Sequence, residues 1–454
     1  MTRSPLPLGS DEPMTLEPLV SVVQPGGAID LLNAYAHLFV GAFLVTLLAT
    51  PIIRRLAIAA GVVDHPDSDR KMHAYPVAYL GGMAVFLGLI VAIGMSYFTG
   101  THLPAGFLPV PFAVVIGMVA ITFTGLADDV WGWDPRLKIA GQLVAAAALA
   151  MESVGVKVAA GLLTPVARWV DPLLGSQELV FTFNTPLGVA SFDTVYWVGT
   201  ALIAIFVLGG CNSANLIDGL DGLLSGVVGV VAIGLLAICL LLAPVAGALP
   251  EGEVSLAGAR IVLSVALLGA VLGFLPHNFN PASIFLGDCG SLLLGYMCVV
   301  IILMLGDRGQ THLVFAGLIV FSLPIIDTTL AIIRRRLAGT PMSAADDQHI
   351  HHQLKRSLGG VKRAVFALYG ISALFAVVGV TLVALVLTQL RVRVVYAIAL
   401  VLFSFIGVTA VKAARRQQLR LAATPRPATP PATTPAASGE ETPRENAGAA
   451  VPKA

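Results

Sequence analysis

The side chains most suited to chemistry lie in three short segments of this chain that are rich in acidic and amide groups. The first is the adjacent pair Asp128 and Asp129, the second is the segment 212–223 (NSANLIDGLDGL), and the third is the segment 278–291 (NFNPASIFLGDCGS). Carboxylates gathered this densely require a cation, and oxygen ligands suit a hard cation such as magnesium. We therefore expect a cation-dependent site assembled from separate parts of the chain.

The spacing within the second segment predicts a shared face. Asn215, Asp218 and Asp221 follow one another at intervals of three residues, so that a helical turn would bring them to one side. Gly219 and Gly222 would let a ligand approach the backbone closely. A hairpin turn between two helices is the alternative, but a turn needs neither the second aspartate nor the two asparagines.

The other two segments combine carboxylates with the end of a helix. In the third segment, Asp288 stands at the predicted start of a helix, where free backbone amides and the positive end of the dipole favour a phosphate. Asp128 and Asp129 would point about 100° apart on a helix end, so that one can face a metal and the other a substrate. An interfacial helix cap is the alternative for this pair. Lys138 is a candidate partner for a carboxylate or a phosphate.

Basic side chains accompany these carboxylates. His349, His351 and His352 stand close in sequence to several arginines and lysines, which would repel a metal ion, so we expect partly protonated imidazoles that bind a diphosphate. Zinc binding and a solvated loop are the alternatives. Lys71 follows the first apolar stretch and would contact phosphate or serve only as a topology signal.

Composition restricts the class of protein. A mean hydropathy of +0.87, with 57% hydrophobic and only 12% charged residues, predicts a membrane protein. The net charge of +1 gives no sign of a nucleic-acid partner. The four cysteines lack the spacing of a zinc site or a disulfide framework, and residues 1–30 lack the layout of a cleaved signal peptide.

A spanning helix needs about 20 apolar residues. On this criterion we expect an all-α polytopic membrane protein with about 11 transmembrane helices, near residues 35–53, 80–98, 109–127, 137–152, 193–211, 222–244, 256–276, 290–306, 312–332, 363–389 and 393–412. Lysines and arginines are concentrated in alternate loops, which predicts an external N-terminus, a cytoplasmic C-terminus, and the polar segments on the cytoplasmic face.

The domain organisation follows from the same pattern. We expect an external N-terminal segment at 1–32, a transmembrane catalytic domain at 33–412 and a disordered cytoplasmic tail at 413–454, where Ala, Pro and Thr predominate. The longest external loop, 153–192, contains short apolar runs that could pair as a small hairpin.

Together, the segments 64–82, 212–223 and 278–295, the Asp128–Asp129 pair and the histidine cluster resemble the polyprenyl-phosphate N-acetylhexosamine-1-phosphate transferase family. The resemblance runs from about residue 35 to residue 412. It implies a fold of ten or eleven helices with a cytoplasmic cleft in a bacterial inner membrane, magnesium dependence with manganese as an alternative, a UDP-sugar donor, and undecaprenyl phosphate in the membrane lipid as acceptor. It does not decide between a monomer and a homodimer.

The resemblance also implies roles for individual residues. Asp288 and Asp218 would be metal ligands, and Asp128 would deprotonate the lipid phosphate with Asp129 beside it. The substrate-binding positions would be Lys71, Lys138, Asn212, Asn215, Asp218, Asp221, Asn278, Phe285, His349, His351 and His352: the asparagines and aspartates of 212–223 on the nucleotide side, Asn278 and Phe285 near the uridine, and Lys71 and the histidines at the diphosphate.

The histidine segment favours one branch of the family. The muramyl branch usually has three consecutive histidines, whereas an isoleucine separates His349 from His351 here. The Asn-Pro-Ala stretch before Asp288 resembles the N-acetylglucosamine branch, so we expect UDP-GlcNAc as donor and UMP as product. Departures from the family pattern are Ala127 and Cys289, neither of which removes a carboxylate. The muramyl branch remains an alternative, and a secondary transporter is an alternative from another class.

Overall fold

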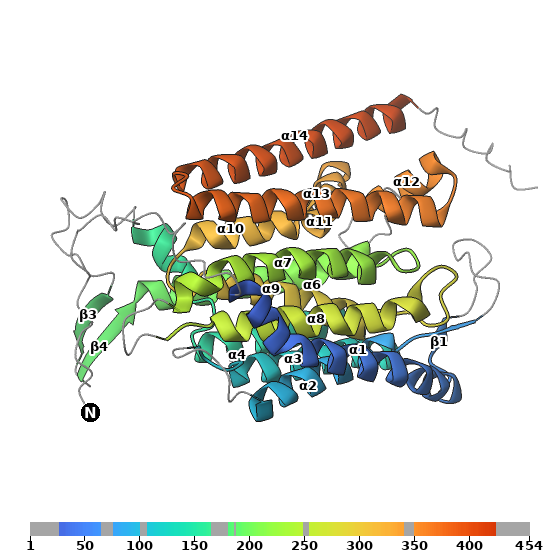
Figure 1. Cartoon of the computed structure of the whole chain (residues 1–454). Coiled ribbons are helices and arrows are strands. Elements are labelled where there is room, and N and C mark those ends of the chain that lie inside the picture. Colours follow the sequence, from blue (N-terminus) through green and yellow to red (C-terminus); the bar gives the residue numbers. More distant parts are fainter. Residues whose placement is uncertain are drawn as a thin grey trace, which may run out of the picture.

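The computed structural model describes residues 27–64, 76–99, 107–164, 180–185, 188–247, 254–339 and 349–423. These residues form a bundle of long helices that run roughly along one common direction (Figure 1). The helices are α1 (Gly27–Ala59), α2 (Gly81–Thr99), α3 (Phe112–Trp131), α4 (Pro135–Met151), α6 (Thr194–Ile217), α7 (Leu223–Gly247), α8 (Ala257–Asn278), α9 (Gly287–Met304), α10 (Thr311–Val320), α11 (Ser322–Ala338), α12 (Ile350–Leu358), α13 (Val361–Leu387) and α14 (Arg393–Ala423).

The predicted all-α polytopic membrane fold is confirmed. Each of the eleven predicted spans corresponds to a helix, except that the span at 312–332 is divided into α10 and α11, which are bent by 79° at the break between them. Eight described helices are long and apolar enough to cross a membrane, or nine if the bent pair is one span. The helix α4 and the apolar part of α14 (Arg393–Thr409) are shorter than that test requires.

The centre of the bundle is α9, which Figure 1 shows surrounded by the other helices. In its most apolar stretch 89% of the residues are buried, against 83% for α8 and 22% for α1. A helix that is apolar on all sides is expected in the core of a large bundle. The first residues of α9 are Gly287 and Asp288, so the core helix carries a carboxylate at its starting end.

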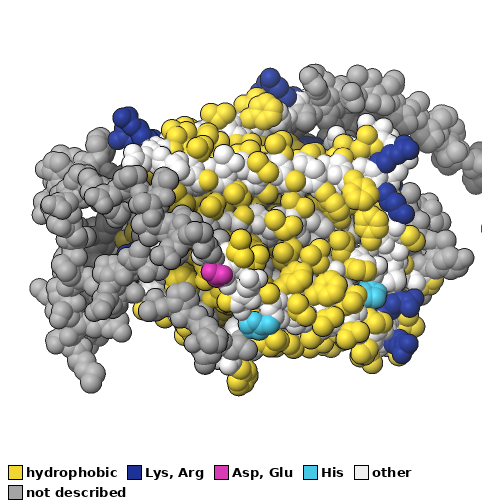
Figure 2. Space-filling model, viewed as in Figure 1, with side chains coloured by type: hydrophobic (Ala, Val, Ile, Leu, Met, Phe, Trp, Pro, Cys, Tyr) yellow, Lys and Arg dark blue, Asp and Glu magenta, His cyan; other side chains and the backbone are white. Residues whose placement is uncertain are grey.

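Large apolar side chains also cover much of the surface. Leu44, Leu48, Phe123 and Phe405 are among many that are exposed, and Figure 2 shows hydrophobic side chains over most of the described part of one face, with Lys and Arg near its edges. An exposed apolar surface of this extent fits contact with lipid.

Short strands lie at the two ends of the bundle. The strands β3 (Val180–Thr185) and β4 (Gly188–Asp193) pair antiparallel, which confirms a hairpin within the loop 153–192. The strands β1 (Val63–Asp64) and β2 (Val77–Ala78) pair at the opposite end (Figure 1). The helix α14 continues to Ala423, beyond the end that we predicted at residue 412. Most of the predicted external segment and the chain after residue 423 lie outside the described residues.

Candidate active site

Lys138 links two of the sequence-predicted carboxylates at the end of the bundle where α9 begins. Its Nζ lies 2.9 Å from Asp128 Oδ2 and also contacts Asp288 Oδ2. Lys138 is held in the first turns of α4, because Asp134 caps this helix by accepting a hydrogen bond of 2.8 Å from the Arg136 amide and Pro135 occupies the first helical position. One ammonium group therefore serves carboxylates from α3 and α9.

Asp129 turns away from this ion pair and binds the backbone of α9. Its Oδ1 accepts from the Asp288 amide at 2.8 Å, and its Oδ2 accepts from the Cys289 amide at 2.9 Å. Negative charge at a helix N-terminus is favourable, and the first amides of a helix otherwise lack partners. Our expectation that these amides would be free for a phosphate is wrong for Asp288 and Cys289. Asp129 instead fixes the backbone of Asp288 at the start of α9.

The close approach of α3 to α9 depends on Gly125. A Cβ at this position would lie 2.5 Å from the Asp288 carbonyl oxygen and 2.5 Å from the Cys289 Cα, which is closer than side-chain atoms come. Gly125 lies one helical turn before Asp128 and Asp129, so the glycine allows the carboxylates of α3 to reach the start of α9.

Asn215 and Asp218 lie at the end of α6, which also meets the start of α9. Asn215 Nδ2 donates to Asp288 Oδ1 at 2.7 Å and to Ser291 Oγ at 2.9 Å. Asp218 follows the last residue of α6, and its carboxylate has neither a hydrogen bond nor an ion pair with another described residue. Removal from water, followed by the charges of Asp288, Asp129 and Asp221, raises the pKa of Asp218 to about 8. An unpaired carboxylate among others calls for a cation.

Asp221 supports the loop that precedes α9. Its Oδ2 accepts from Asn280 Nδ2 at 2.8 Å and from the Ala282 amide at 3.1 Å. The loop also pairs with the chain before α2, since the Phe285 amide donates to the Ala78 carbonyl at 2.8 Å. The Phe285 ring is partly exposed and lies 5.9 Å from the Tyr79 ring. A planar ring is thus presented beside the carboxylates.

Two predicted substrate-binding residues are engaged elsewhere. Asn212 donates to Gln142 Oε1 at 2.9 Å and to the Leu208 carbonyl at 2.7 Å, which ties α6 to α4. Asn278 is 3% exposed, donates to the Ile284 carbonyl at 3.1 Å and accepts from Ser225 at 2.7 Å. The structure therefore places both amides in support of the fold and not in the carboxylate group. Lys71 lies outside the described residues.

The histidines gather at the start of α12. The His351 ring stacks on that of His349 at 5.4 Å and lies 4.3 Å from that of His352. Burial, and then the charge of His352, lowers the pKa of His351 to about 3. His351 is therefore neutral at physiological pH, and the expectation of a partly protonated imidazole is wrong for this residue.

Sequence reasoning missed Asp327. This aspartate on α11 is 1% exposed and accepts a hydrogen bond from His349 Nδ1 at 2.9 Å. A signal was present, because Asp327 is the one acidic residue within the predicted span 312–332, and ionisable residues in spans are usually functional or paired.

The carboxylates fit a magnesium ion. Asp218 has no cation partner among the described residues, and the nearby charge of Asp288 helps to raise its pKa. Lys138 pairs with Asp288 and Asp128 but not with Asp218, so the Asp218 carboxylate is the group whose charge is not offset. Magnesium binds through one or two carboxylates plus substrate phosphates. A second donor set consists of Asp327, His349 and His351, whose ligand atoms lie within 4.8 Å of one another.

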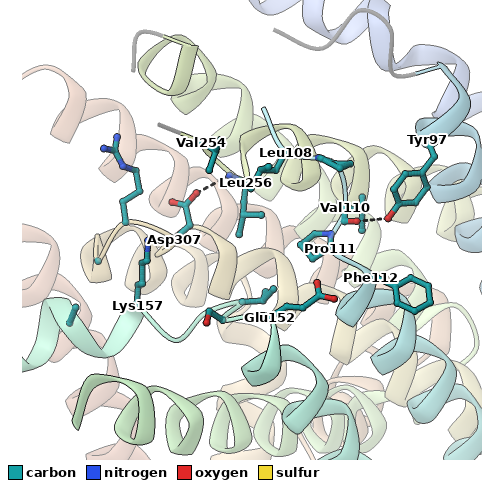
Figure 3. Close-up of a pocket in the computed structure, with 16 residues that line it drawn as sticks. Tyr97, Leu108, Val110, Pro111, Phe112, Glu152, Lys157, Val254, Leu256 and Asp307 are labelled. Carbon is teal, nitrogen blue, oxygen red and sulfur yellow. Dashed lines mark hydrogen bonds between the residues drawn. The ribbon is translucent and has the colours of Figure 1, made fainter. Parts of the chain in front are cut away.

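A cavity of about 1070 Å³ lies at the other end of the bundle (Figure 3). It is formed where α3 begins and where α4 and α9 end, and its lining includes Glu152, Lys157 and Asp307. Asp307 accepts from the Leu256 amide at 3.0 Å and pairs with Arg260 at 3.4 Å. A large hollow is the usual first candidate for an active site, but here the acidic residues with unmet charge lie elsewhere. We therefore assign the site by its chemistry.

The fold and the site define a multi-pass membrane protein with a carboxylate centre at one end of its helical bundle. The sequence matches the model of glycosyl transferase family 4 over residues 111–306, a range that runs from α3 to the end of α9 and includes Asp128, Asp129, Asp218, Asp221 and Asp288. Together with the relatives below, this match shows that the chain belongs to this family.

Several relatives are similar over most of their length. The probable undecaprenyl-phosphate N-acetylglucosaminyl 1-phosphate transferase of Bacillus subtilis is 33% identical over 347 residues, covering 76% of this chain and 84% of the relative. The decaprenyl-phosphate N-acetylglucosaminephosphotransferase of Mycobacterium tuberculosis is also 33% identical, covering 72% and 77%. The phospho-N-acetylmuramoyl-pentapeptide-transferase of Shouchella clausii is 29% identical, covering 75% and 94%.

Proposed function

We propose that this protein transfers GlcNAc-1-phosphate from UDP-GlcNAc to undecaprenyl phosphate and releases UMP, which starts a lipid-linked glycan of the bacterial cell envelope. One observation carries the proposal: Lys138 bridges Asp128 and Asp288, while Asp218 beside them has no cationic partner in the described part of the chain. This arrangement suits two phosphorylated substrates and a divalent ion. The names of the two relatives that are 33% identical support the choice of sugar.

The proposed reaction is a displacement at phosphorus. An oxygen of the lipid phosphate forms a bond to the β-phosphorus of the donor. The bond between that phosphorus and the oxygen bridging to the α-phosphorus breaks, and UMP leaves with its electron pair. Both reactants are anions, so positioning and neutralisation of charge supply most of the catalysis.

The residues divide this work between them. Asp128 takes the remaining proton of the lipid phosphate, and Lys138 offsets negative charge between Asp128 and Asp288. Phe285 stacks on the uracil, and the histidines at α12, with Lys71, contact the diphosphate. Asp218 and Asp288 would hold magnesium, which when bound supplies positive charge at the phosphates.

We place this site on the cytoplasmic side of the plasma membrane. Lys138 and Arg54 lie at the end of the bundle that carries the carboxylates, since Arg54 donates to the Ser283 carbonyl in the loop before α9, and short loops rich in such residues are retained in the cytoplasm. The donor UDP-GlcNAc is a charged nucleotide that would approach from the same side.

A donor competition tests the proposed function. Membranes that contain the protein are given magnesium, undecaprenyl phosphate and, separately, labelled UDP-GlcNAc or labelled UDP-MurNAc-pentapeptide. We expect labelled lipid and one UMP for each lipid formed with UDP-GlcNAc only. Product from the muramyl donor alone would assign the protein to the branch of the relative from Shouchella clausii. Uptake of a solute without release of UMP would contradict the transferase and indicate a transporter.

A further inference from the structure

Asp327 joins α11 to the histidine segment through both of its carboxylate oxygens. Oδ2 accepts from His349 Nδ1 at 2.9 Å, and Oδ1 accepts from the Ile350 amide at 2.8 Å. The side chain is 1% exposed, and a buried carboxylate is stable only when it is paired or hydrogen-bonded. Oδ2 also lies 3.8 Å from His351 Nδ1. These contacts are therefore specific features of the fold.

The contact with Ile350 fixes where α12 begins. Ile350 is the first residue of this helix, and His349 at the N-cap position makes no capping hydrogen bond through its own side chain. Asp327 provides the cap from another helix, with a negative charge at the end where the helix dipole favours one. The position at which α12 begins, relative to α11, thus depends on Asp327.

The contact with His349 fixes the tautomer of this imidazole. A carboxylate oxygen can only accept, so Nδ1 of His349 must carry the hydrogen, and Nε2 is left for another group. At metal sites, removal of a carboxylate that orients a histidine in this way typically costs about 10- to 100-fold in activity or affinity, and we expect an effect of similar size here.

His351 connects this arrangement to the carboxylate centre. Its ring stacks on that of His349 at 5.4 Å, with 15° between the planes, and its buried Nδ1 has no hydrogen-bond partner in the described part of the chain. On its other side, His351 Nε2 would lie 2.3 Å from a Cβ at position 219, so only glycine leaves room for the ring there. Gly219 directly follows Asp218. A shift of α12 would therefore disturb the loop that carries Asp218.

We propose that Asp327 is a positioning residue, which sets the His349 tautomer and the start of α12 and so holds the imidazoles against the Asp218 loop. The inference rests on the proposed function, because the imidazoles would then face the donor diphosphate. It differs from a zinc site formed by Asp327, His349 and His351. The hydrogen bond between His349 Nδ1 and Asp327 already engages two of the three possible ligands. Arg334, also buried, lies two helical turns along α11, and its positive charge would disfavour a metal ion.

The variant Asp327→Asn separates positioning from folding. The asparagine oxygen can still cap Ile350, but its NH₂ group then faces His349 Nδ1 and forces the hydrogen of the imidazole onto Nε2. We expect kcat/KM for UDP-GlcNAc to fall about 10- to 100-fold, with an unchanged yield and thermal midpoint in detergent. Asp193→Asn is the matched control, since Asp193 also caps a helix, α6, but at the opposite end of the bundle, and it should retain full activity.

A double-mutant cycle with His349→Ala tests whether Asp327 acts through His349. In that background Asp327→Asn should lower kcat/KM by less than about twofold, because the effects of substituting two coupled residues are not additive. Wild-type kinetics for Asp327→Asn, an equal loss in both backgrounds, or one stoichiometric zinc ion in the purified protein would overturn the inference.

Binding of UDP to the purified protein provides a readout that is independent of turnover. If the wild type formed no lipid product, the proposed function would be wrong, and the same cycle would be measured on the UDP dissociation constant. In that cycle Asp327→Asn should raise the UDP dissociation constant about tenfold only when His349 is present. Equal UDP affinity in all four proteins would overturn the inference by itself.

Discussion

Lys138 contacts both Asp128 and Asp288, so one positive charge stands against two negative charges. A single ammonium cannot neutralise two carboxylates from different helices together with Asp218 nearby. The remaining negative charge would be offset when magnesium binds. The two aspartates that contact Lys138 should therefore be the least replaceable residues of the site.

Asp288→Asn and Asp128→Asn are each expected to lower transfer at least about 100-fold, because each removes charge where the reacting phosphates meet. Glu152→Gln is the matched control, since Glu152 lines the cavity at the other end of the bundle. Its activity should equal that of the wild type. Full activity in both aspartate variants, or loss of activity only in the Glu152 variant, would show that the site is not at the end of the bundle where we assign it.

The raised pKa of Asp218 predicts a pH-dependent affinity for metal. The pKa of about 8 in the metal-free protein means that a proton occupies this carboxyl below pH 8 and must leave when a metal binds. The dissociation constant for Mn²⁺, measured without substrate by electron paramagnetic resonance, should fall about tenfold per unit from pH 6 to 8 and level off above. Asp218→Asn should bind Mn²⁺ weakly, and its dissociation constant should not change with pH in this range. An equally steep pH dependence in this variant would assign the proton to another group.

The sequence located the chemistry of the site but not the partners of each residue. The acidic segments could be found because charged and amide groups are unusual in so apolar a chain. The sequence could not show that both oxygens of Asp129 accept hydrogen bonds from the start of α9, or that Asn212 contacts Gln142 and Asn278 contacts Ser225. Such contacts join residues far apart in sequence, and local spacing does not contain them.

At the scale of the elements, the site depends on how closely α3 packs against the start of α9. Gly125→Ala places a methyl group against the backbone of Asp288 and Cys289, so we expect activity to fall more than tenfold and stability to fall by about 1–3 kcal/mol. Gly94→Ala on α2 is the control, because nothing lies within 4 Å of a Cβ there. Thermal unfolding and transfer assays check both variants, and an unchanged Gly125→Ala would show that the helices can separate freely.

The break between α10 and α11 was not predicted. The span 312–332 is apolar enough to read as one straight helix, but Pro324 lies in the first turn of α11. Because a proline cannot donate to the carbonyl four residues earlier and its ring clashes with that carbonyl, Pro324 favours a break after Val320, next to Phe321, where the bend of 79° occurs. Asp327 then lies on the second half of the broken pair, from which it reaches the histidines.

At the scale of the whole molecule, the hairpin β3–β4 and the helix α12 mark opposite ends (Figure 1). All four native cysteines are buried, so introduced cysteines can be labelled with little background. With the proposed orientation, Ser191→Cys on β4 should react with an impermeant maleimide on intact cells. Ser357→Cys on α12 should react only after permeabilisation, and the reverse pattern would place the carboxylates outside.

The central claim is that a sugar and its phosphate move together to the lipid. UDP-GlcNAc labelled with ³²P at the β-phosphorus, incubated with undecaprenyl phosphate, magnesium and the purified protein, tests this directly. We expect the label to appear in the lipid in equal amount to unlabelled UMP, and Asp288→Asn to abolish this transfer. Label that remains in released UDP would show transfer of the sugar alone and would contradict the account.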